Sequence, residues 1–170
     1  MELWDIYNED RVRTGRTTVR GLTMRAGEYH LIVHIAIINS KGRMLVQQRQ
    51  QSKKGWPGKW DISAGGCAMA GENSRLAAQR ELEEELGIGL DFTQRRAALT
   101  INFDGGFDDI YIIRGDYDLT DLRLQQSEVL AARWACADEI MDMIDSEEFV
   151  PYHKSYIQLL FDTAVRPVYL

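Results

Sequence analysis

One segment of the sequence, residues 74–86, restricts the fold more than any other, because its apolar residues recur at helical spacing. The residues that predict the buried side of this helix are Leu76, Ala77, Leu82 and Leu86. Gly87 follows directly and is typical of the residue that ends a helix in a left-handed conformation. We therefore predict a helix over residues 74–86 that packs one side against a core and turns a polar side toward a cleft.

The polar side of this helix carries three glutamates. Glu81, Glu84 and Glu85 stand at positions i, i+3 and i+4, so their carboxylates project from one face. Arg80 can pair with Glu84 but cannot neutralise three carboxylates. A glutamate-rich helix is more often a solvated surface. The alternative is a site for a hard divalent cation such as Mg²⁺, which prefers oxygen ligands.

The residues around the helix decide between these interpretations. The stretch from Gly66 to Ile88 resembles the Nudix box, G-x5-E-x7-R-E-U-x-E-E-x-G-U, where U is an aliphatic residue. The residues that match its specified positions are Gly66, Glu72, Arg80, Glu81, Leu82, Glu84, Glu85, Gly87 and Ile88. The probability of a chance match to seven fixed residues, at roughly 6% frequency each, is below about 10⁻⁶. The resemblance therefore favours the metal site.

The resemblance implies a mixed α/β fold, in which a mixed β-sheet lies between helices and the box forms a loop–helix–loop. The groups that the family pattern assigns to binding Mg²⁺ or Mn²⁺ are Glu81, Glu84, Glu85 and the backbone carbonyl of Gly65. Arg80 matches an arginine that fixes the helix by pairing with acidic residues, and Glu72 matches its partner in the loop. Gly66 lies where the chain must approach the substrate closely, and Gly87 has a structural role in the motif.

Members of the Nudix family hydrolyse nucleoside or other diphosphates that are linked to a further group, by attack of water on phosphorus. We therefore expect a metal-dependent hydrolase that cleaves a diphosphate linkage in a small molecule, with Arg80, Glu84, Glu85 and Glu128 as catalytic residues. Glu128 precedes a predicted strand, where many family members place a further carboxylate. It is either a metal ligand or general base, or a solvated loop residue.

The resemblance outside the box indicates one competing function, that of isopentenyl-diphosphate isomerase. The segments that carry it include His30-Leu31, Trp56-Pro57-Gly58-Lys59-Trp60 and Glu128-Val129. Those isomerases use a catalytic cysteine, and this chain has Gly65 at the corresponding position. They also carry a histidine ligand where this chain has Cys67, and they lack part of the box core that is complete here. We therefore favour hydrolysis, and a domain that senses a nucleotide without turnover is the third hypothesis.

Three residues in or near a glycine-rich loop are our candidates for substrate binding. Trp56 offers an aromatic face to a base or a prenyl group, while Arg49 and Lys59 carry charges that attract phosphates. His34 falls in an apolar strand, where a histidine is more often a hydrogen-bonded core residue than a ligand. An acidic run beside a Gly-Gly turn is expected to be solvated, and it comprises Asp104, Asp108 and Asp109.

The rest of the pattern predicts further strands and helices. Strands are predicted at residues 4–7, 31–38, 43–48, 97–103, 109–113 and 131–134, and helices at 137–145 and 154–163. Residues 55–66 hold four glycines and are predicted as a structured loop, whereas the arginine-rich residues 11–25 show no clear pattern. No repeat or linker divides the chain, so we expect one domain over residues 1–170, with the box at 66–88.

Composition sets the broad class of protein. The formal net charge of −6 argues against a nucleic-acid-binding protein, which would show a basic face. Two cysteines are too few for a disulfide scaffold and indicate a reducing compartment. The N-terminus shows no signal-peptide pattern, and the longest apolar run is too short to span a membrane. We therefore expect a cytoplasmic protein without nucleic-acid or membrane partners, with a small-molecule diphosphate as substrate and a homodimer as the default assembly.

Overall fold

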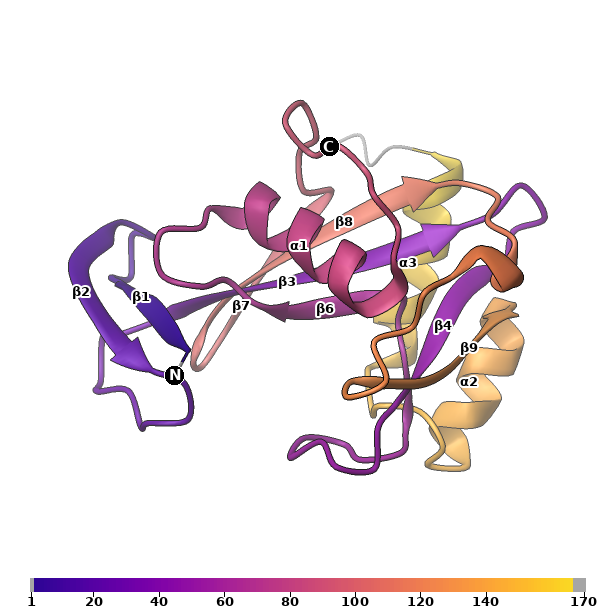
Figure 1. Cartoon of the computed structure of the whole chain (residues 1–170), viewed down its shortest axis with the longest axis horizontal. Coiled ribbons are helices and arrows are strands. Elements are labelled where there is room, and N and C mark those ends of the chain that lie inside the picture. The colour runs from indigo at the N-terminus through magenta and orange to yellow at the C-terminus, as the bar shows by residue number, and fades with distance from the viewer. Residues whose placement is uncertain (1, 167–170) are drawn as a thin grey trace.

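The computed structural model describes residues 2–166, in which a mixed β-sheet lies between helices (Figure 1). Its strands are β1 (Leu3–Tyr7), β2 (Arg13–Val19), β3 (His30–Ile38), β4 (Met44–Arg49), β5 (Trp60–Asp61), β6 (Ala64–Cys67), β7 (Leu99–Phe103), β8 (Gly106–Arg114) and β9 (Val129–Ala135). Its helices are α1 (Ser74–Leu86), α2 (Ala137–Asp145), α3 (Lys154–Val165) and a short 3-10 helix, η1 (Leu119–Asp121). This arrangement confirms the predicted mixed α/β class. No helix within residues 2–166 is long and apolar enough to cross a membrane.

Helix α1 begins and ends where the sequence predicts, and its two ends explain why. The side chain of Asn73 accepts a hydrogen bond from the backbone N–H of Leu76 at 3.0 Å, which caps the first turn. Gly87 has a φ of 70°, and its N–H donates to the carbonyl of Glu83. The predicted buried side is wrong at Leu76, which is 52% exposed. The reason is that Leu76 lies about 120° around the helix from the buried Leu82.

Two other segments differ from the expectation. Residues 55–66, predicted as a loop, contain β5 and most of β6. Strand β6 was not predicted because the glycines at 65 and 66 give it no alternation of apolar and polar side chains. The arginine-rich residues 11–25 contain β2, which pairs with β1 in a separate two-stranded sheet. Most of β2 is exposed, so it also lacks an alternating pattern.

The main sheet is built around β3. Strand β3 pairs with β8 in parallel, in register from His30↔Gly106 to Ile38↔Arg114. The antiparallel strands β6 and β7 pair with β3 and β8 respectively. Strand β4 meets β3 at Ile38↔Met44 and pairs with β5 and β9. Strands β3 and β4 diverge from this point, and β6 runs beside β3 on the side toward β4 (Figure 1).

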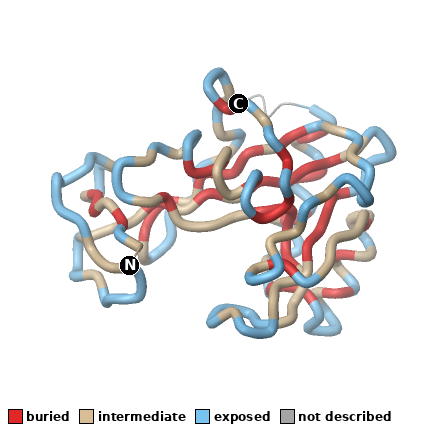
Figure 2. The backbone as a smooth tube through the Cα atoms, in the orientation of Figure 1, coloured by how far each residue is buried: buried red, intermediate tan, exposed pale blue. Residues whose placement is uncertain are grey.

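The two faces of β3 are covered to different extents. Figure 2 shows β3 partly buried toward its start and buried toward its end. Odd-numbered positions from 31 to 37 are buried in a core that includes residues of α1. Even-numbered positions 36 and 38 are buried in a second core with residues of α2 and α3. The even-numbered positions toward the start of β3 are only half-buried, and these are His30, Ile32 and His34. Helices α2 and α3 therefore leave part of one sheet face uncovered.

Candidate active site

A cavity of about 210 Å³ lies beside α1, at the edge of β6. Most of its lining side chains are charged. Its acidic residues are Glu2, Glu81, Glu84, Glu85 and Glu128, and its basic residues are Arg20, Lys53 and Arg80. The cavity therefore combines carboxylates, which bind cations, with cationic groups, which attract phosphates. We call it the glutamate cavity.

Arg80 fixes the loop before α1 to the helix. Its Nε and Nη2 donate to the two carboxylate oxygens of Glu72 at 2.7 and 2.9 Å, and Nη2 also donates to the carbonyl of Cys67 at 3.1 Å. Its Nη1 donates to Glu81 at 2.9 Å and to Glu84 at 3.0 Å. Burial opposes the guanidinium charge, but the carboxylates outweigh burial and raise the pKa of Arg80 above its usual value. Arg80 thus fixes the position of the loop before α1 and of the Glu81 and Glu84 carboxylates.

Glu85 is the most deeply buried carboxylate of the cavity, with 3% of its surface exposed. Its Oε2 accepts a hydrogen bond from the backbone N–H of Gly65 at 3.1 Å. Burial, followed by the charge of Glu81, raises the pKa of Glu85 to about 8. Burial also raises the pKa of Glu81 above its ordinary value. Both carboxyl groups therefore hold protons more tightly than a free glutamate does.

Two glycines let β6 pass between α1 and β3. A Cβ added at Gly66 would lie 2.2 Å from Oε1 of Glu81, so any side chain there would displace the carboxylate. A Cβ added at Gly65 would lie 2.5 Å from Cδ2 of His34 on β3. Close approach of the backbone, and not turn formation, is therefore the reason for glycine at these two positions.

The donor set of the cavity fits a divalent metal ion by its chemistry. Glu81, Glu84 and Glu85 offer the hard oxygen donors that Mg²⁺ and Mn²⁺ prefer, and a cation would relieve the repulsion that contributes to the raised pKa of Glu85. As placed, Glu81 and Glu84 turn toward Arg80. Within residues 2–166, no three His, Cys, Asp or Glu side chains already form a metal-binding group. Binding one ion through all three glutamates would therefore require side-chain rotation.

Glu128 reaches the cavity from a distant part of the chain. Its carboxylate pairs with the ammonium of Lys53, and its carbonyl accepts a hydrogen bond from the N–H of Gln50 at 2.8 Å. The N–H of Gln125 donates to the carbonyl of Glu85 at 3.1 Å. The loop before β9 is thereby tied both to the end of β4 and to α1. These contacts place the Glu128 side chain on the glutamate cavity.

The three candidates for substrate binding lie outside the glutamate cavity. Arg49 donates through Nη1 to Asp61 at 3.0 Å. Lys59 donates to the carbonyl of Glu147. Trp56 is 49% exposed, and the Nζ of Lys59 lies 6.0 Å from its ring centre. The structure therefore does not bring these side chains together with the glutamates.

His34 and the acidic run make contacts within the protein. Nδ1 of His34 and Oδ2 of Asp108 are 2.8 Å apart, which agrees with the prediction of a hydrogen-bonded histidine. The prediction of a solvated acidic turn is wrong at Asp109, which is buried and pairs with Arg11. The reason is that β8 begins at Gly106, so both aspartates belong to the strand.

Sequence reasoning missed two charged residues of the cavity, Glu2 and Arg20. Oε2 of Glu2 accepts a hydrogen bond from Nη1 of Arg20 at 2.7 Å. Both lie just outside the β1–β2 pair, of which the sequence pattern predicted β1 but neither β2 nor the pairing. Lys53, which the sequence presents as one of several loop lysines, is the lysine that pairs with Glu128. The density of arginines in residues 11–25 was the one available signal.

Comparison with known proteins identifies the family. Residues 28–160 match the family model described as NUDIX domain. An uncharacterized Nudix hydrolase of Listeria monocytogenes is 47% identical over 152 residues, which cover 89% of this chain and 90% of that protein. An uncharacterized Nudix hydrolase of Listeria innocua is 44% identical over 162 residues, which cover 95% of each chain.

Solved structures share the fold. The Deinococcus radiodurans protein DR0079 gives a TM-score of 0.76 at 22% identity, covering 94% of this chain and 97% of its own. The MutT protein of Methanosarcina mazei gives 0.60 at 24% identity, covering 81% and 96%. At these identities the structures show the fold, while the family model and the Listeria relatives show the class of enzyme. The chain therefore belongs to the Nudix family and is a Nudix hydrolase.

Proposed function

We propose that this enzyme hydrolyses a diphosphate linkage in a nucleoside diphosphate derivative or another small organic diphosphate, with Mg²⁺ or Mn²⁺ as its cofactor. Nudix hydrolases are generally pyrophosphohydrolases that use divalent metal ions. The single observation that carries the proposal is one shared cavity. In it, Glu81, Glu84 and Glu85 lie with a further carboxylate from outside the box and with cationic side chains.

Each group has a role that its position supports. The groups that would hold the metal ion are Glu81, Glu84, Glu85 and the carbonyl of Gly65. When bound, the ion polarises a phosphoryl oxygen and offsets negative charge. Arg20 and Lys53 attract the diphosphate by charge, while Gly66 brings the backbone to it as part of the cavity lining. Arg80 and Glu72 keep the loop and the helix in place.

The proposed reaction is the attack of water on one phosphorus of the diphosphate. A bond forms between the water oxygen and phosphorus, the bridging P–O bond breaks, and the leaving phosphate keeps the electron pair. Glu128 accepts the proton of the attacking water, as a carboxylate on the cavity can do. The ion pair with Lys53 holds the Glu128 carboxylate in position.

Hydrolysis is favoured over isomerisation of isopentenyl diphosphate by the positions of the thiols. Gly65 occupies the place of the isomerase cysteine. Cys67 does line the cavity, but burial raises the pKa of its thiol to about 12. A thiol of this kind is neither a nucleophile nor a base near neutral pH.

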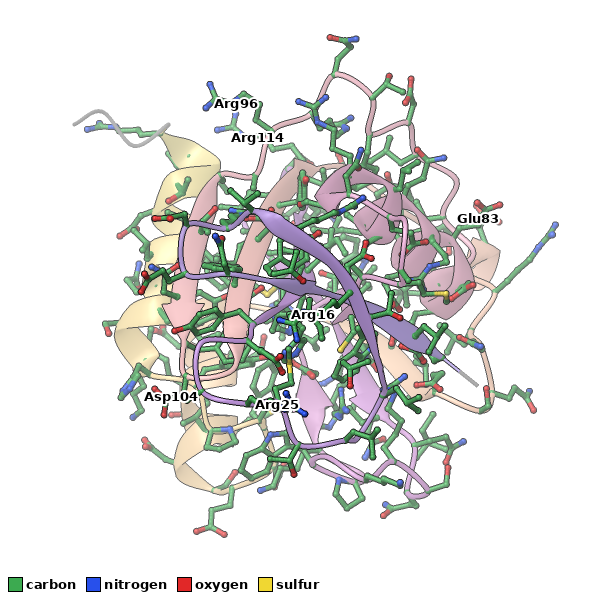
Figure 3. All side chains as sticks on the ribbon, turned by 90° about the vertical axis from the view of Figure 1, so that its left-hand side faces the viewer. Arg16, Arg25, Glu83, Arg96, Asp104 and Arg114 are labelled. Carbon is green, nitrogen blue, oxygen red and sulfur yellow. The ribbon has the colours of Figure 1, made fainter. Side chains whose placement is uncertain are left out.

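The test is an assay of the purified protein with a panel of diphosphates and either Mg²⁺ or Mn²⁺. The panel contains nucleoside diphosphate derivatives and isopentenyl diphosphate, and we expect metal-dependent release of phosphate or mononucleotide. Glu85→Gln should lower turnover roughly 10²- to 10³-fold, because one charged group of the site is lost. The matched control is Glu83→Gln. Glu83 is an exposed glutamate of α1 (Figure 3) that does not line the cavity, so this variant should keep full activity. An isomerised alkene, or binding without turnover, would contradict the proposal.

We also propose a cytoplasmic location and a homodimer. Both cysteines, Cys67 and Cys136, are free thiols, which fits a reducing compartment. Light scattering on the purified protein should give twice the chain mass of 19.5 kDa. A mass of one chain would contradict the dimer.

A further inference from the structure

A larger cavity, of about 990 Å³, lies at the end of the sheet where one face of β3 is uncovered. Side chains from β1, from the start of β3 and from the β7–β8 turn line it, and its rings include Trp4, His30 and Phe103. We call it the aromatic cavity. We propose that it binds the nucleobase of a nucleoside diphosphate derivative whose diphosphate lies in the glutamate cavity. This inference rests on the proposed function of the glutamate cavity.

Three rings form one wall of the aromatic cavity. Trp4 and His30 stack with ring centres 4.6 Å apart and planes inclined by 11°. Phe103 meets His30 edge-on at 5.5 Å, and it is 38% exposed. Nδ1 of His30 lies 2.8 Å from the carbonyl of Gly105, which fixes the orientation of the imidazole. A rigid aromatic wall with one accessible ring is a surface on which a planar base stacks.

A chain of hydrogen bonds connects the two cavities. Nε1 of Trp4 donates to Oε1 of Glu2 at 2.9 Å, and Oε2 of Glu2 accepts from Arg20 at 2.7 Å. Trp4 lines the aromatic cavity, whereas Glu2 and Arg20 line the glutamate cavity. The two cavities therefore share a wall. In the proposed binding mode, the base lies in the aromatic cavity and the diphosphate in the glutamate cavity, on either side of the Trp4–Glu2 hydrogen bond.

The polar groups of the aromatic cavity favour a base over a prenyl chain. Charged and amide side chains also line this cavity, and Figure 3 shows two of them, Arg25 and Asp104, on this end of the molecule. The polar residues of the lining are Glu9, Arg25, Glu28, Asn102 and Asp104. Base edges carry donors and acceptors that can pair with such groups, whereas a prenyl chain would cover them without pairing them. Trp56, the aromatic residue that the sequence favours for substrate binding, lines neither cavity.

The test measures binding to the wild-type protein and its variants, with Mg²⁺ present. The probes are the methylene-bridged analogues of ADP and of isopentenyl diphosphate, in which the diphosphate linkage cannot be hydrolysed. Phe103→Ala should raise the Kd of the ADP analogue about tenfold through lost stacking, and leave the Kd of the isopentenyl analogue within about twofold. The matched control is Ile101→Ala, since Ile101 lies on the same strand, is 40% exposed and does not line the cavity.

Each other outcome overturns the inference. An equal rise in the Kd of both analogues in Phe103→Ala would show that Phe103 has a general structural effect. An unchanged Kd of the ADP analogue would place the base elsewhere. A rise in the Kd of the ADP analogue in Trp56→Ala, with no rise in Phe103→Ala, would place the base at the loop of residues 53–59. Because binding needs no turnover, the inference and the proposed function fail separately. A protein that binds the ADP analogue through Phe103 but hydrolyses no diphosphate would contradict the proposed function alone.

Discussion

The glutamate cavity and the aromatic cavity are neighbours, but the chain builds them in different ways. The first takes Glu81, Glu84 and Glu85 from one stretch of a single helix. The second takes its three rings from β1, β3 and β7, which lie far apart in the sequence. A contiguous motif therefore supplies the carboxylates proposed to act at the diphosphate. The surface proposed to bind the rest of the substrate depends instead on how β1, β3 and β7 are brought together by the fold.

The two cavities also differ in the state of their polar groups. In the glutamate cavity, burial and like charge raise the pKa of Glu85 to about 8. In the aromatic cavity, Trp4 and His30 already have hydrogen-bond partners, and burial lowers the pKa of His30, which favours its neutral form. We therefore expect the glutamate cavity to respond strongly to pH and to added cations, and the aromatic cavity to respond to the shape of the ligand.

The largest expected effect of this difference is the pH dependence of metal binding. Because the pKa of Glu85 is about 8, a cation that binds below this pH must displace a proton. The affinity for Mn²⁺ should therefore rise about tenfold per unit from pH 6 to pH 8 and then level off. Calorimetric titrations in buffers of different ionisation enthalpy measure the affinity and the released proton together.

Two controls for this titration follow from the difference between the two cavities. Glu85→Gln should reduce the slope, because the carboxyl group with the pKa of about 8 is gone. The affinity for adenosine, which has no diphosphate, should change little over the same range if it binds in the aromatic cavity. A wild-type Mn²⁺ affinity that is flat between pH 6 and pH 8 would contradict the role of Glu85.

A smaller effect is expected from Gly66→Ala. The added Cβ would lie 2.2 Å from Oε1 of Glu81, so the carboxylate must move. We expect turnover to fall roughly 10- to 100-fold, with the affinity for adenosine unchanged. The control is Gly89→Ala, where an added Cβ meets no atom within 4 Å. Full turnover in Gly66→Ala would show that the position of Glu81 does not matter for the reaction.

The last expected effect is on the stability of the metal-free protein. The pKa of Glu85 rises from 4.5 to about 8 on folding, so the folded state binds the extra proton between these values and loses stability as pH increases. Glu85→Gln should therefore raise the Tm at pH 8, by roughly 2–4 °C for each kcal/mol gained in the free energy of unfolding. At pH 4.5 the Tm should change little. Scanning calorimetry with a chelator measures this. A lower Tm of Glu85→Gln at pH 8 would mean that the ionised carboxylate stabilises the fold.

Local sequence rules predicted the parts of the fold that local contacts determine. Helix α1 has a cap at Asn73, a left-handed stop at Gly87 and a buried apolar stripe, so its bounds followed from its own residues. Strands β3 and β4 followed in the same way from apolar runs on either side of a turn. Strand β6 did not, because Gly65 and Gly66 are determined by Glu81 and His34, which are brought close by the tertiary structure.

The same division applies to the candidate site. The motif predicted the three helix glutamates and the pairing of Arg80 with Glu72, which the structure brings within 2.7 Å. Glu2 and Arg20 could not be predicted, because their place depends on how the β1–β2 pair sits against the main sheet. The aromatic cavity escaped prediction for the same reason, since no local pattern connects residues of β1, β3 and β7.

The most direct test of the account is a crystal structure with Mn²⁺ and the methylene-bridged ADP analogue, in which anomalous scattering locates the metal. We expect Mn²⁺ beside Glu81, Glu84 and Glu85, with the diphosphate next to it. Mn²⁺ and diphosphate bound elsewhere, with the three carboxylates still turned toward Arg80 and Gly65, would contradict it.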